Sequence, residues 1–393
     1  MPPLRVLHVI PSLSPRDGGP TRAIGIMERG LSAAGVEVTT LTTDHGLGPA
    51  RAGVTENGAR RIHAHTWLIP YKVAPGLVPH LLQAVKQHDV VHIHALFSFA
   101  ATAAAWAAAR QGVPYVVRPL GTLSGYGLNA RRPRLKQLSM ALIERRILRA
   151  AAAVHFTSRA ELAEAEALGL PLRAVVIPLG VDADAGGPAA PFSHAALAGR
   201  RVILFLSRLD PKKNVEALID AVAGSPTLRS TAALLIAGDG DGRYVAGLKA
   251  RAAAAGVADH TVWLGHIEGA EKQAALAAAD AFVLPSFSEN FGIAAVEALA
   301  AGLPCVLGRG VAIAHEVADA GAGVAVAPEP AAIAGALEGV LGGDPSVAHD
   351  MAQRARYLAA QRFTSHAMAK RLIALYEDIR KPARRAEMAT AES

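Results

Sequence analysis

Two glutamates in the last third of the chain have a spacing that suits the binding of hydroxyl groups. Glu289 follows the strand-like apolar run Ala281–Pro285, and Glu297 comes eight residues later, in a helix expected to begin around Phe291. Eight residues exceed two helical turns, but Glu289 precedes the helix, so both carboxylates can face one cleft. Carboxylates accept hydrogen bonds from paired hydroxyls, such as a ribose diol or a sugar ring. We therefore expect a polyhydroxylated ligand here, and a capped surface helix is the alternative.

Two basic residues at the end of another predicted strand are suited to a diphosphate. Arg208 follows the run Arg201–Ser207, and Lys213 comes after a turn set by Pro211. Asn214 is expected to cap the next helix. Fixed cations stabilise the negative charge of a departing nucleoside diphosphate without a metal ion. Solvated surface cations are the alternative.

Glycines follow two further predicted strands. Gly18 and Gly19 precede a helix expected to start near Thr21, so the backbone can approach a phosphate at the helix N-terminus. The pattern is not a dinucleotide fingerprint, and a plain tight turn is the alternative. We interpret the Asp-Gly-Asp run around Gly240 as room for a nucleotide or sugar, and not as a metal motif.

Short β-rich runs alternate with helical patterns, which is typical of βαβ units around parallel sheets. The strands expected in the first half are Arg5–Ile10, Glu37–Thr42, Ile62–Trp67, Val90–Ala95, Tyr115–Arg118, Ala153–Thr157 and Ala174–Pro178. The helices expected between them include Thr21–Ala34, Leu77–Gln87, Phe99–Arg110 and Leu135–Arg149. The strands expected in the second half are Arg201–Ser207, Ala233–Ala237, Thr261–Leu264, Ala281–Leu284, Cys305–Leu307 and Gly323–Ala327. The fold class is therefore α/β, with doubly wound parallel sheets.

The length of 393 residues suits two domains of roughly 180 residues each. We expect one domain at 1–180 and another at 200–365, joined by a Gly- and Pro-containing connector at 181–199. Helices are expected at Ser346–Arg362 and His366–Arg380, followed by a frayed polar tail from Lys381. Ligands of open α/β sheets bind beyond the carboxyl ends of the strands, so two such domains facing each other would gather these motifs in one central cleft.

Composition narrows the class of protein further. A net charge of +7 and 51% hydrophobic residues describe a folded, basic chain that suits an anionic partner, and no nucleic-acid-binding motif is present. The single cysteine, Cys305, lies in an apolar run and is expected to be a buried structural thiol. The apolar run Leu4–Ile10 is too short for a signal peptide core, and the Ala-rich stretch Ala95–Ala109 is too weakly apolar for a membrane span. We expect the protein to be cytoplasmic.

Five motifs in order resemble one known family. They are the Pro11–Pro20 loop, Ser207–Asn214, Ile236–Gly240, Leu264–His266 and Ser288–Glu297. The chain resembles, over nearly its whole length, the retaining nucleotide-sugar glycosyltransferases of the GT-B architecture, family 4. The resemblance implies two Rossmann-like domains, an N-terminal one for the acceptor and a C-terminal one for the donor. It also implies that the last helix crosses back onto the N-terminal domain.

The resemblance assigns roles to particular residues. It implies that Glu297 binds the ribose hydroxyls, that Glu289 binds the donor sugar, and that Arg208 and Lys213 bind the diphosphate. Backbone contacts to the donor are further implied for Gly18, Gly19, Gly240, Asn290, Phe291 and Gly292. His266 and Ile267 are implied to edge the pocket of the nucleobase, and an ordinary loop is the alternative for these two residues. It implies no protein nucleophile, because the leaving phosphate takes the acceptor's proton. It implies no metal and no cofactor beyond the nucleotide sugar, a UDP- or GDP-hexose.

One departure from the family concerns the acceptor side. Many relatives carry a histidine after the fifth strand of the N-terminal domain, where this chain reads Val117–Leu123 without one. Arg118, main-chain groups near Gly121 or the nearby His94 are the candidate replacements. His92 and His94 alternate with apolar residues and so point to one face of a strand. A structural role is the alternative for both histidines.

The segment Arg131–Arg149 combines leucines at helical spacing with a basic flank. Leu135, Leu138 and Leu142 form an apolar stripe that Ile143 and Ile147 widen. Such a helix can rest on an anionic membrane, where it would serve a glycan or lipid-linked acceptor of cell-surface polysaccharide or glycolipid assembly. An ordinary core-packed helix is the alternative.

Two other functions remain open on the sequence. A sugar-nucleotide epimerase would keep the fold but would need an acid and base pair around the sugar, which the two glutamates do not suggest. A non-catalytic sugar-nucleotide-binding partner would have less need for intact Glu289, Glu297, Arg208 and Lys213.

Overall fold

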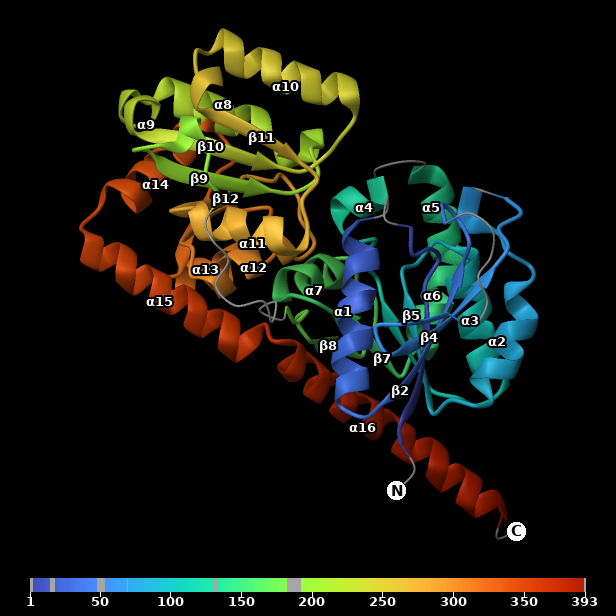
Figure 1. Cartoon of the computed structure of the whole chain (residues 1–393). Helices are drawn as coiled ribbons and strands as arrows, with labels where there is room; N and C mark the ends of the chain where they lie inside the picture. Colours follow the sequence, from blue (N-terminus) through green and yellow to red (C-terminus); the bar gives the residue numbers. More distant parts are fainter. Residues whose placement is uncertain are drawn as a thin grey trace. The chain divides into compact units, whose positions relative to one another are not determined.

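The computed structural model describes residues 3–14, 18–47, 54–68, 70–129, 133–181 and 192–391. The chain divides into two compact units, each with its own sheet (Figure 1). Unit 1 comprises Met1–Gly180 together with Ser365–Ser393, and unit 2 comprises Val181–Thr364. The last helix is thus grouped with the N-terminal residues. The connector expected at 181–199 falls in unit 2, where Ala195–Leu197 form a short 3-10 helix, and residues 182–191 lie outside the described part.

Unit 1 is built on an eight-stranded sheet in the order β3-β4-β2-β1-β5-β6-β7-β8. All neighbours run parallel except β3 and β4. The strands are β1 (Arg5–Val9), β2 (Glu37–Thr43), β3 (Val54–Glu56), β4 (Ala59–Ala64), β5 (Val90–His94), β6 (Tyr115–Arg118), β7 (Ala153–Phe156) and β8 (Ala174–Val176). The helical elements are α1 (Gly19–Ala33), η2 (Pro70–Lys72), α2 (Leu77–Val85), α3 (Phe99–Arg110), α4 (Gly125–Asn129), α5 (Pro133–Ser139), η3 (Met140–Glu144), α6 (Arg145–Ala150), α7 (Arg159–Glu166) and α16 (Ser365–Ala391).

The two faces of this sheet differ in chemistry. Side chains alternate along each strand, and Leu7, Val9, Val91 and Ile93 belong to the apolar core that also holds residues of α2, α3 and α6. The residues between them are histidines, and they lie on the other face. Helix α16 packs against α1 and supplies Tyr376 to these histidines (Figure 1). The alternation predicted for His92 and His94 is confirmed.

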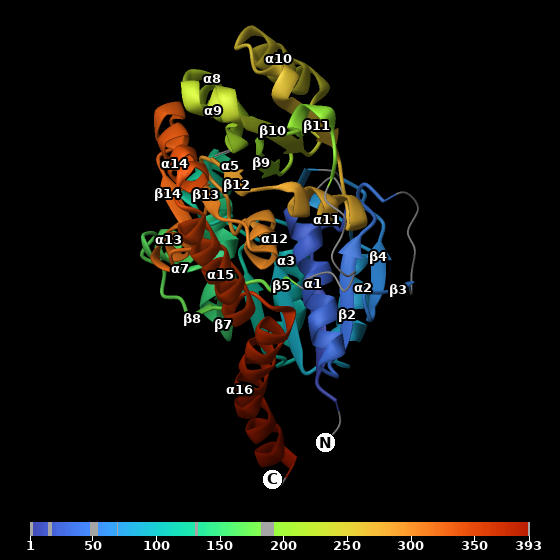
Figure 2. The same cartoon turned by 60° about the vertical axis from the view of Figure 1, so that its left-hand side comes forward.

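Unit 2 is built on a six-stranded, all-parallel sheet in the order β11-β10-β9-β12-β13-β14. The strands are β9 (Arg201–Leu206), β10 (Ala232–Ala237), β11 (Thr261–Gly265), β12 (Ala281–Leu284), β13 (Cys305–Gly308) and β14 (Gly323–Val326). The helical elements are η4 (Ala195–Leu197), η5 (Pro211–Lys213), α8 (Val215–Gly224), α9 (Pro226–Thr231), α10 (Gly242–Ala254), η6 (Ala258–His260), α11 (Gly269–Ala278), α12 (Ile293–Ala301), α13 (Ala314–Asp319), α14 (Pro330–Gly342) and α15 (Pro345–Arg362). Helices α8, α9, α10 and α14 cover one face, and α11 and α12 the other (Figure 2). The predicted doubly wound α/β class is confirmed.

Each sheet has one point where the strand order reverses direction. In unit 1 this switch lies between β1 and β5, and in unit 2 between β9 and β12. A crevice forms at such a point outside the carboxyl ends of the strands, because the crossover helices leave the sheet on opposite faces there. The loops that follow these four strands are therefore the places where the fold itself favours ligand binding.

The structure corrects four sequence predictions. The strand expected at Ile62–Trp67 is β4, at Ala59–Ala64, and it pairs with β3 across a turn at Asn57 (φ 52°) and Gly58 (φ 78°). Asn-Gly is the dipeptide that such a turn favours. The helix expected from Phe291 begins at Ile293, because Gly292 adopts a left-handed conformation with φ 88°.

The other two corrections concern helix continuity. The helix expected at Leu135–Arg149 is divided by a π-helical stretch into α5, η3 and α6. Helix α16 continues through Ala391, so the tail expected to fray from Lys381 is helical. In the described part of the chain, no helix has both the length and the apolar character required to span a bilayer.

Candidate active site

The predicted cation and carboxylate of unit 2 are in direct contact. The ammonium of Lys213, at the end of η5, forms an ion pair with Glu289. Lys213 is 4% exposed, whereas the Glu289 side chain keeps 21% of its surface accessible. Burial, followed by the charges of Lys212 and Arg208, lowers the pKa of Lys213 to about 7, and Asp210 acts in the opposite direction. The contact with the Glu289 carboxylate favours the charged ammonium.

Backbone and amide hydrogen bonds fix this pair at the switch point of unit 2. The N–H of Phe287 donates to the carbonyl of Lys212 over 2.9 Å, which ties the loop after β12 to the loop after β9. The N–H of Glu289 donates to Gly310 over 2.9 Å. Asn214 has a left-handed backbone (φ 59°), and its amide donates to the carbonyl of Pro328 over 2.7 Å. The predicted cap residue therefore joins loops instead of capping α8 with its side chain. Arg208, on the same β9 loop, is exposed.

The second predicted carboxylate has a partner that the sequence did not reveal. Lys272 of α11 donates from Nζ to Oε1 of Glu297 over 2.9 Å, and both residues are below 9% exposed. Lys272 lies 25 residues before Glu297, so no spacing rule along one helix connects them. The pair fixes the position of the Glu297 carboxylate on α12.

The remaining donor residues fall into two groups. Gly292 caps the N-terminus of α12, whose first backbone N–H groups follow Asn290 and Phe291 in sequence. The Phe291 ring itself is 3% exposed and packs edge-on against Phe363, so only its backbone is available to a ligand. Gly18 (φ 65°) occupies the corresponding cap position of α1, and an added Cβ on Gly19 would meet no atom within 4 Å. The cap residues Gly18 and Gly292 have no side chain that could cover the helix N-terminus, so a ligand can approach its backbone N–H groups.

Gly240 is required by packing against the protein's own chain. A Cβ at Gly240 would lie 2.1 Å from the carbonyl oxygen of Leu209, with which it forms a β-bridge. This contact accounts for the glycine without a ligand, and the donor contact expected at Gly240 stays a prediction. Asp241 caps α10 by accepting hydrogen bonds from Arg243 and Tyr244, so it is occupied as a structural residue.

A pocket of about 340 Å³ opens at the carboxyl ends of β10 and β11. Its walls include the Trp263 ring, Gly238 and Gly265, with Asp239 and Lys249 as polar groups. Ile267, just beyond, is 8% exposed, and the His266 side chain is 65% exposed and 3.1 Å from Glu268. A larger cavity, about 440 Å³, lies at the amino ends of β6, β7 and β8 and holds none of the predicted site residues.

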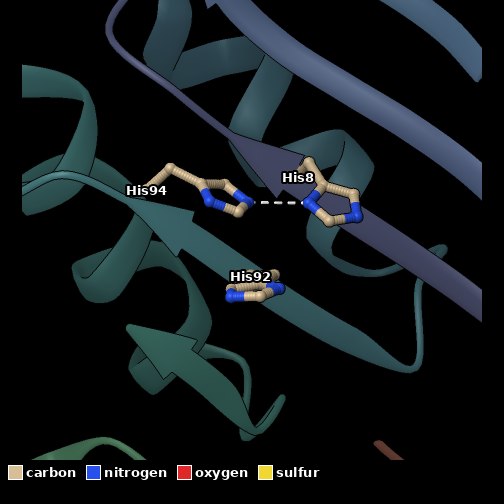
Figure 3. Close-up of side chains that lie close together, drawn as sticks. All are labelled: His8, His92 and His94. Atoms are coloured by element: carbon tan, nitrogen blue, oxygen red, sulfur yellow. Dashed lines mark hydrogen bonds between the residues drawn. The ribbon is translucent and has the colours of Figure 1, made fainter. Parts of the chain in front are cut away.

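The acceptor-side candidate His94 belongs to a buried histidine cluster (Figure 3). His8, His92, His94 and His155 are all completely buried. His8 Nδ1 and His94 Nε2 are 2.7 Å apart and share a hydrogen bond. The ring nitrogens of His8, His92 and His94 lie within 4.8 Å of one another, which is metal-ligating proximity. However, His92 already uses both nitrogens in hydrogen bonds, and a buried arginine adds positive charge, so the cluster suits hydrogen bonding better than a cation.

The hydrogen bonds of this cluster have a defined direction. His155 Nε2 is 2.8 Å from the carbonyl of Ile177, which only accepts, so His155 donates there and its Nδ1 accepts from His92 Nε2 at 3.3 Å. His92 Nδ1 then accepts from the Tyr376 hydroxyl at 2.7 Å. This order requires neutral rings. Burial, and then the charge of Arg118, lower the pKa of both His8 and His155 to about 3.

Two of the three predicted acceptor-side groups, His94 and Arg118, are thus held inside unit 1, whereas Gly121 is half-buried. Arg118 is 1% exposed, and burial lowers its pKa to about 10 while Glu161 opposes this shift. The N–H of Gly121 donates to Glu161 over 2.8 Å. Neither Arg118 nor His94 reaches the surface, so the acceptor contacts expected of them would require the core to open. Leu120 (φ 59°) stands where the loop turns toward Gly121.

The cysteine prediction is confirmed. Cys305 is completely buried, and burial raises its pKa far from the range of a reactive thiol.

Comparison with known proteins identifies the family. The sequence profile described as "Glycosyl transferases group 1" matches residues 188–358, and that described as "Glycosyl transferase 4-like domain" matches residues 18–180. The chain is 35% identical over 222 residues to phosphatidyl-myo-inositol mannosyltransferase of Mycobacterium leprae, covering 54% of this chain and 55% of that protein. It is 32% identical to 2-deoxystreptamine glucosyltransferase of Streptomyces kanamyceticus, covering 55% and 58%. The chain spans about half the length of these relatives.

Solved structures show the same fold. Sucrose-phosphate synthase of Thermosynechococcus elongatus superposes with a TM-score of 0.75 at 21% identity, over 96% of this chain and 99% of that one. HepE of Anabaena, in complex with UDP and glucose, superposes with a TM-score of 0.74 at 20% identity, over 95% and 100%. With its two parallel-sheet units, its ordered motifs and these two profiles, the chain belongs to the group 1 glycosyltransferases of the GT-B fold.

Proposed function

We propose that the protein transfers a hexosyl unit from a UDP- or GDP-hexose to a hydroxyl acceptor, with retention of the anomeric configuration and without a metal ion. The observation that carries this proposal is the ion pair between Lys213 and Glu289 at the switch point of unit 2. It brings together a cation suited to a diphosphate and a carboxylate suited to hydroxyl groups. A donor whose diphosphate and sugar are adjacent needs these two groups side by side.

In this proposal the diphosphate is bound by Arg208, Lys213 and the N-terminus of α12. The phosphate oxygens replace Glu289 as the partner of the Lys213 ammonium, and Glu289 is released to accept hydrogen bonds from the donor sugar. The two cations then stabilise the charge that grows on the departing diphosphate. Glu297, held by Lys272, accepts the ribose hydroxyls. The base extends toward Gly265, His266 and Ile267, where the pocket of about 340 Å³ lies.

Retention follows in this proposal from reaction on one face of the sugar. The bond between the anomeric carbon and the diphosphate oxygen breaks, the acceptor oxygen bonds to the same face of that carbon, and the acceptor's proton passes to the departing phosphate oxygen. Atoms and charge balance without a protein nucleophile. Arg208 and Lys213 supply the positive charge that a divalent ion would otherwise provide.

We further propose a lipid-linked or glycan acceptor of cell-surface assembly and peripheral association with the inner face of the cell membrane. Relatives named for phosphatidyl-myo-inositol as a substrate support a lipid acceptor, and the net charge of +7 supports an anionic surface.

The function is tested with hexose-labelled UDP- and GDP-donors and membrane lipid extract as acceptor source. We expect transfer from one donor and release of the nucleoside diphosphate. The anomeric configuration of the product, determined by NMR spectroscopy, should be that of the donor. Product of inverted configuration would refute the retaining mechanism. Tight binding of the donor without transfer to any acceptor in membrane or soluble extracts would instead favour a non-catalytic binding protein.

A further inference from the structure

The helical segment Pro133–Ala150 has two apolar faces, one packed on the core of unit 1 and one exposed. Ile147 and Leu148 are buried, and Met140 and Ile143 pack against the apolar core of unit 1. The segment therefore has the core contacts that an ordinary amphipathic helix requires.

A second stripe, of three leucines on the outer face of the segment, does not belong to the apolar core of unit 1. Leu135, Leu138 and Leu142 are each 55–56% exposed, although they sit at the i, i+3 and i+7 spacing of one helix face. The segment carries four exposed arginines, Arg134, Arg145, Arg146 and Arg149. Arg131 and Arg132 lie outside the described residues. Exposed leucines among cations fit an anionic bilayer, where the apolar side chains enter the interface and the arginines meet the headgroups.

The same segment holds the loop that follows β5. Glu144, in the π-helical stretch, is completely buried, and its Oε1 accepts hydrogen bonds from the Phe97 N–H at 3.1 Å and from the Ser139 hydroxyl at 3.0 Å. The Lys136 ammonium lies 6.0 Å from the centre of the Phe97 ring. Phe97 is thus held by two residues of the segment, through its backbone and through its ring.

The held loop is strained and lies where unit 1 favours ligands. Ala95 (φ 71°) and Phe97 (φ 55°) adopt left-handed backbone conformations, which cost roughly 1 kcal/mol or more each for residues other than glycine. Such conformations persist only where neighbours hold them. The loop follows β5, one of the two strands at the switch point of unit 1. The Phe97 end of this loop is therefore held by the segment that carries the exposed leucines.

We propose that the outer leucine stripe of residues 133–150 docks on an anionic bilayer, and that Glu144 and Lys136 transmit this docking to the Ala95–Phe97 loop, which positions the lipid-linked acceptor. The proposal deepens the function proposed above and rests on it for the identity of the acceptor. Glu144 acts here as a positioning residue, through the Phe97 backbone, and not as a catalytic residue.

The docking step is tested by sedimentation of the full chain with phosphatidylglycerol–phosphatidylcholine vesicles. We expect binding to these vesicles at low salt and not to pure phosphatidylcholine vesicles. The variant Leu135→Ser/Leu138→Ser/Leu142→Ser should bind at least about tenfold more weakly, since each leucine loses its burial in the interface. Its matched control is Val347→Ser/Tyr357→Ser, which removes two other exposed apolar side chains, at 55% and 69% exposure on α15, and should bind like the wild type. Equal binding by the leucine variant would refute the docking surface.

The coupling step is tested by amide hydrogen exchange over residues 95–99, which needs no identified acceptor. Anionic vesicles should slow exchange there at least about threefold in the wild type, and not in the leucine variant. Glu144→Met should bind vesicles normally but lose this protection, whereas Glu144→Gln, which keeps an acceptor oxygen for the Phe97 N–H, should retain it. Unchanged exchange in vesicle-bound wild type would refute the coupling, whatever the variants do.

Failure of this inference is distinguishable from failure of the proposed function. Binding of UDP and GDP, followed by calorimetry without vesicles, should be the same in the wild type and the leucine variant, because the stripe lies in unit 1 and the diphosphate residues in unit 2. Loss of nucleotide binding by the wild type would contradict the proposed function alone. Retained nucleotide binding without vesicle binding would contradict the inference alone.

Discussion

Lys272 and Glu297 form a buried ion pair that joins two helices of unit 2, with Nζ and Oε1 2.9 Å apart. Its position fixes the carboxylate proposed to accept the ribose hydroxyls. Removal of one member of a buried pair leaves the other charge in a poorly solvated place, and this loss exceeds the net stabilisation that the intact pair provides.

Lys272→Met should therefore lower the free energy of unfolding by about 3 kcal/mol and weaken nucleoside diphosphate binding. The double variant Lys272→Met/Glu297→Leu should recover most of the stability but not the binding. Urea denaturation and calorimetry separate the two effects. A double variant no more stable than Lys272→Met would show that the pair does not control the stability of this region.

Substitution of the two glutamates should affect different parts of the donor. Glu289→Ala and Glu297→Ala should both nearly abolish turnover with the fold intact. Glu297→Ala should weaken binding of the free nucleoside diphosphate, whereas Glu289→Ala should leave it similar or tighter, because Lys213 loses a competing carboxylate. Titration of each variant with the free diphosphate and the intact nucleotide sugar checks this. Wild-type turnover in either variant would contradict the assignment.

Activity should persist in excess EDTA, because Arg208 and Lys213 are proposed to neutralise the diphosphate in place of a divalent ion. The control is Lys213→Ala, which should lose activity with or without added magnesium or manganese. Complete loss of wild-type activity on chelation, restored by either metal, would contradict metal independence.

Tyr376→Phe should lower the free energy of unfolding by about 1–2 kcal/mol. The substitution removes the hydroxyl that donates to Nδ1 of His92, and this buried nitrogen is left without a hydrogen bond. Tyr357→Phe is the matched control: Tyr357 is 69% exposed, and its variant should unfold at the wild-type urea concentration. Equal stability of the two variants would show that the hydroxyl of Tyr376 contributes nothing to the docking of α16.

Stability should fall steeply as the pH drops below about 6.5. The folded-state pKa of His8 and of His155 is about 3, against 6.5 in the unfolded chain, so the unfolded state binds more protons between these values. The stabilisation is complete above pH 6.5 and is lost progressively toward pH 3, by about 2 kcal/mol per histidine at pH 5. Urea denaturation between pH 7.5 and 5 measures the slope.

The matched variant for this pH dependence is His155→Gln. Its amide can donate to Ile177 and accept from His92 as the imidazole does. The slope of stability against pH near pH 5 should be about 1.4 kcal/mol per pH unit shallower than in the wild type. An unchanged slope would mean that His155 is protonated in the folded protein.

Much of the fold could be predicted from the sequence, because most strands are buried and parallel and their apolar runs end at turn residues. The predicted strands from Arg5–Ile10 to Gly323–Ala327 correspond to strands of the structure, apart from the shift of β4. That shift arose because the hairpin partner, Val54–Glu56, is short and exposed and carries no core pattern. Its Asn57-Gly58 turn was the available signal.

The sequence alone determined which residues follow the carboxyl ends of the strands, and therefore that Arg208, Lys213 and Glu289 belong to one edge of a sheet. It could not determine which long-range partners each polar side chain finds. Lys272 with Glu297, and His8, His155 and Tyr376 around His92, meet across different elements, and such contacts depend on how helices pack on the sheets. The sequence also did not show that His94 and Arg118 are buried. Nor did it show that Leu135, Leu138 and Leu142 are exposed. A helical apolar pattern gives the spacing of a stripe, but only the tertiary structure decides which stripe faces the core, because the surrounding elements compete for the same buried surface.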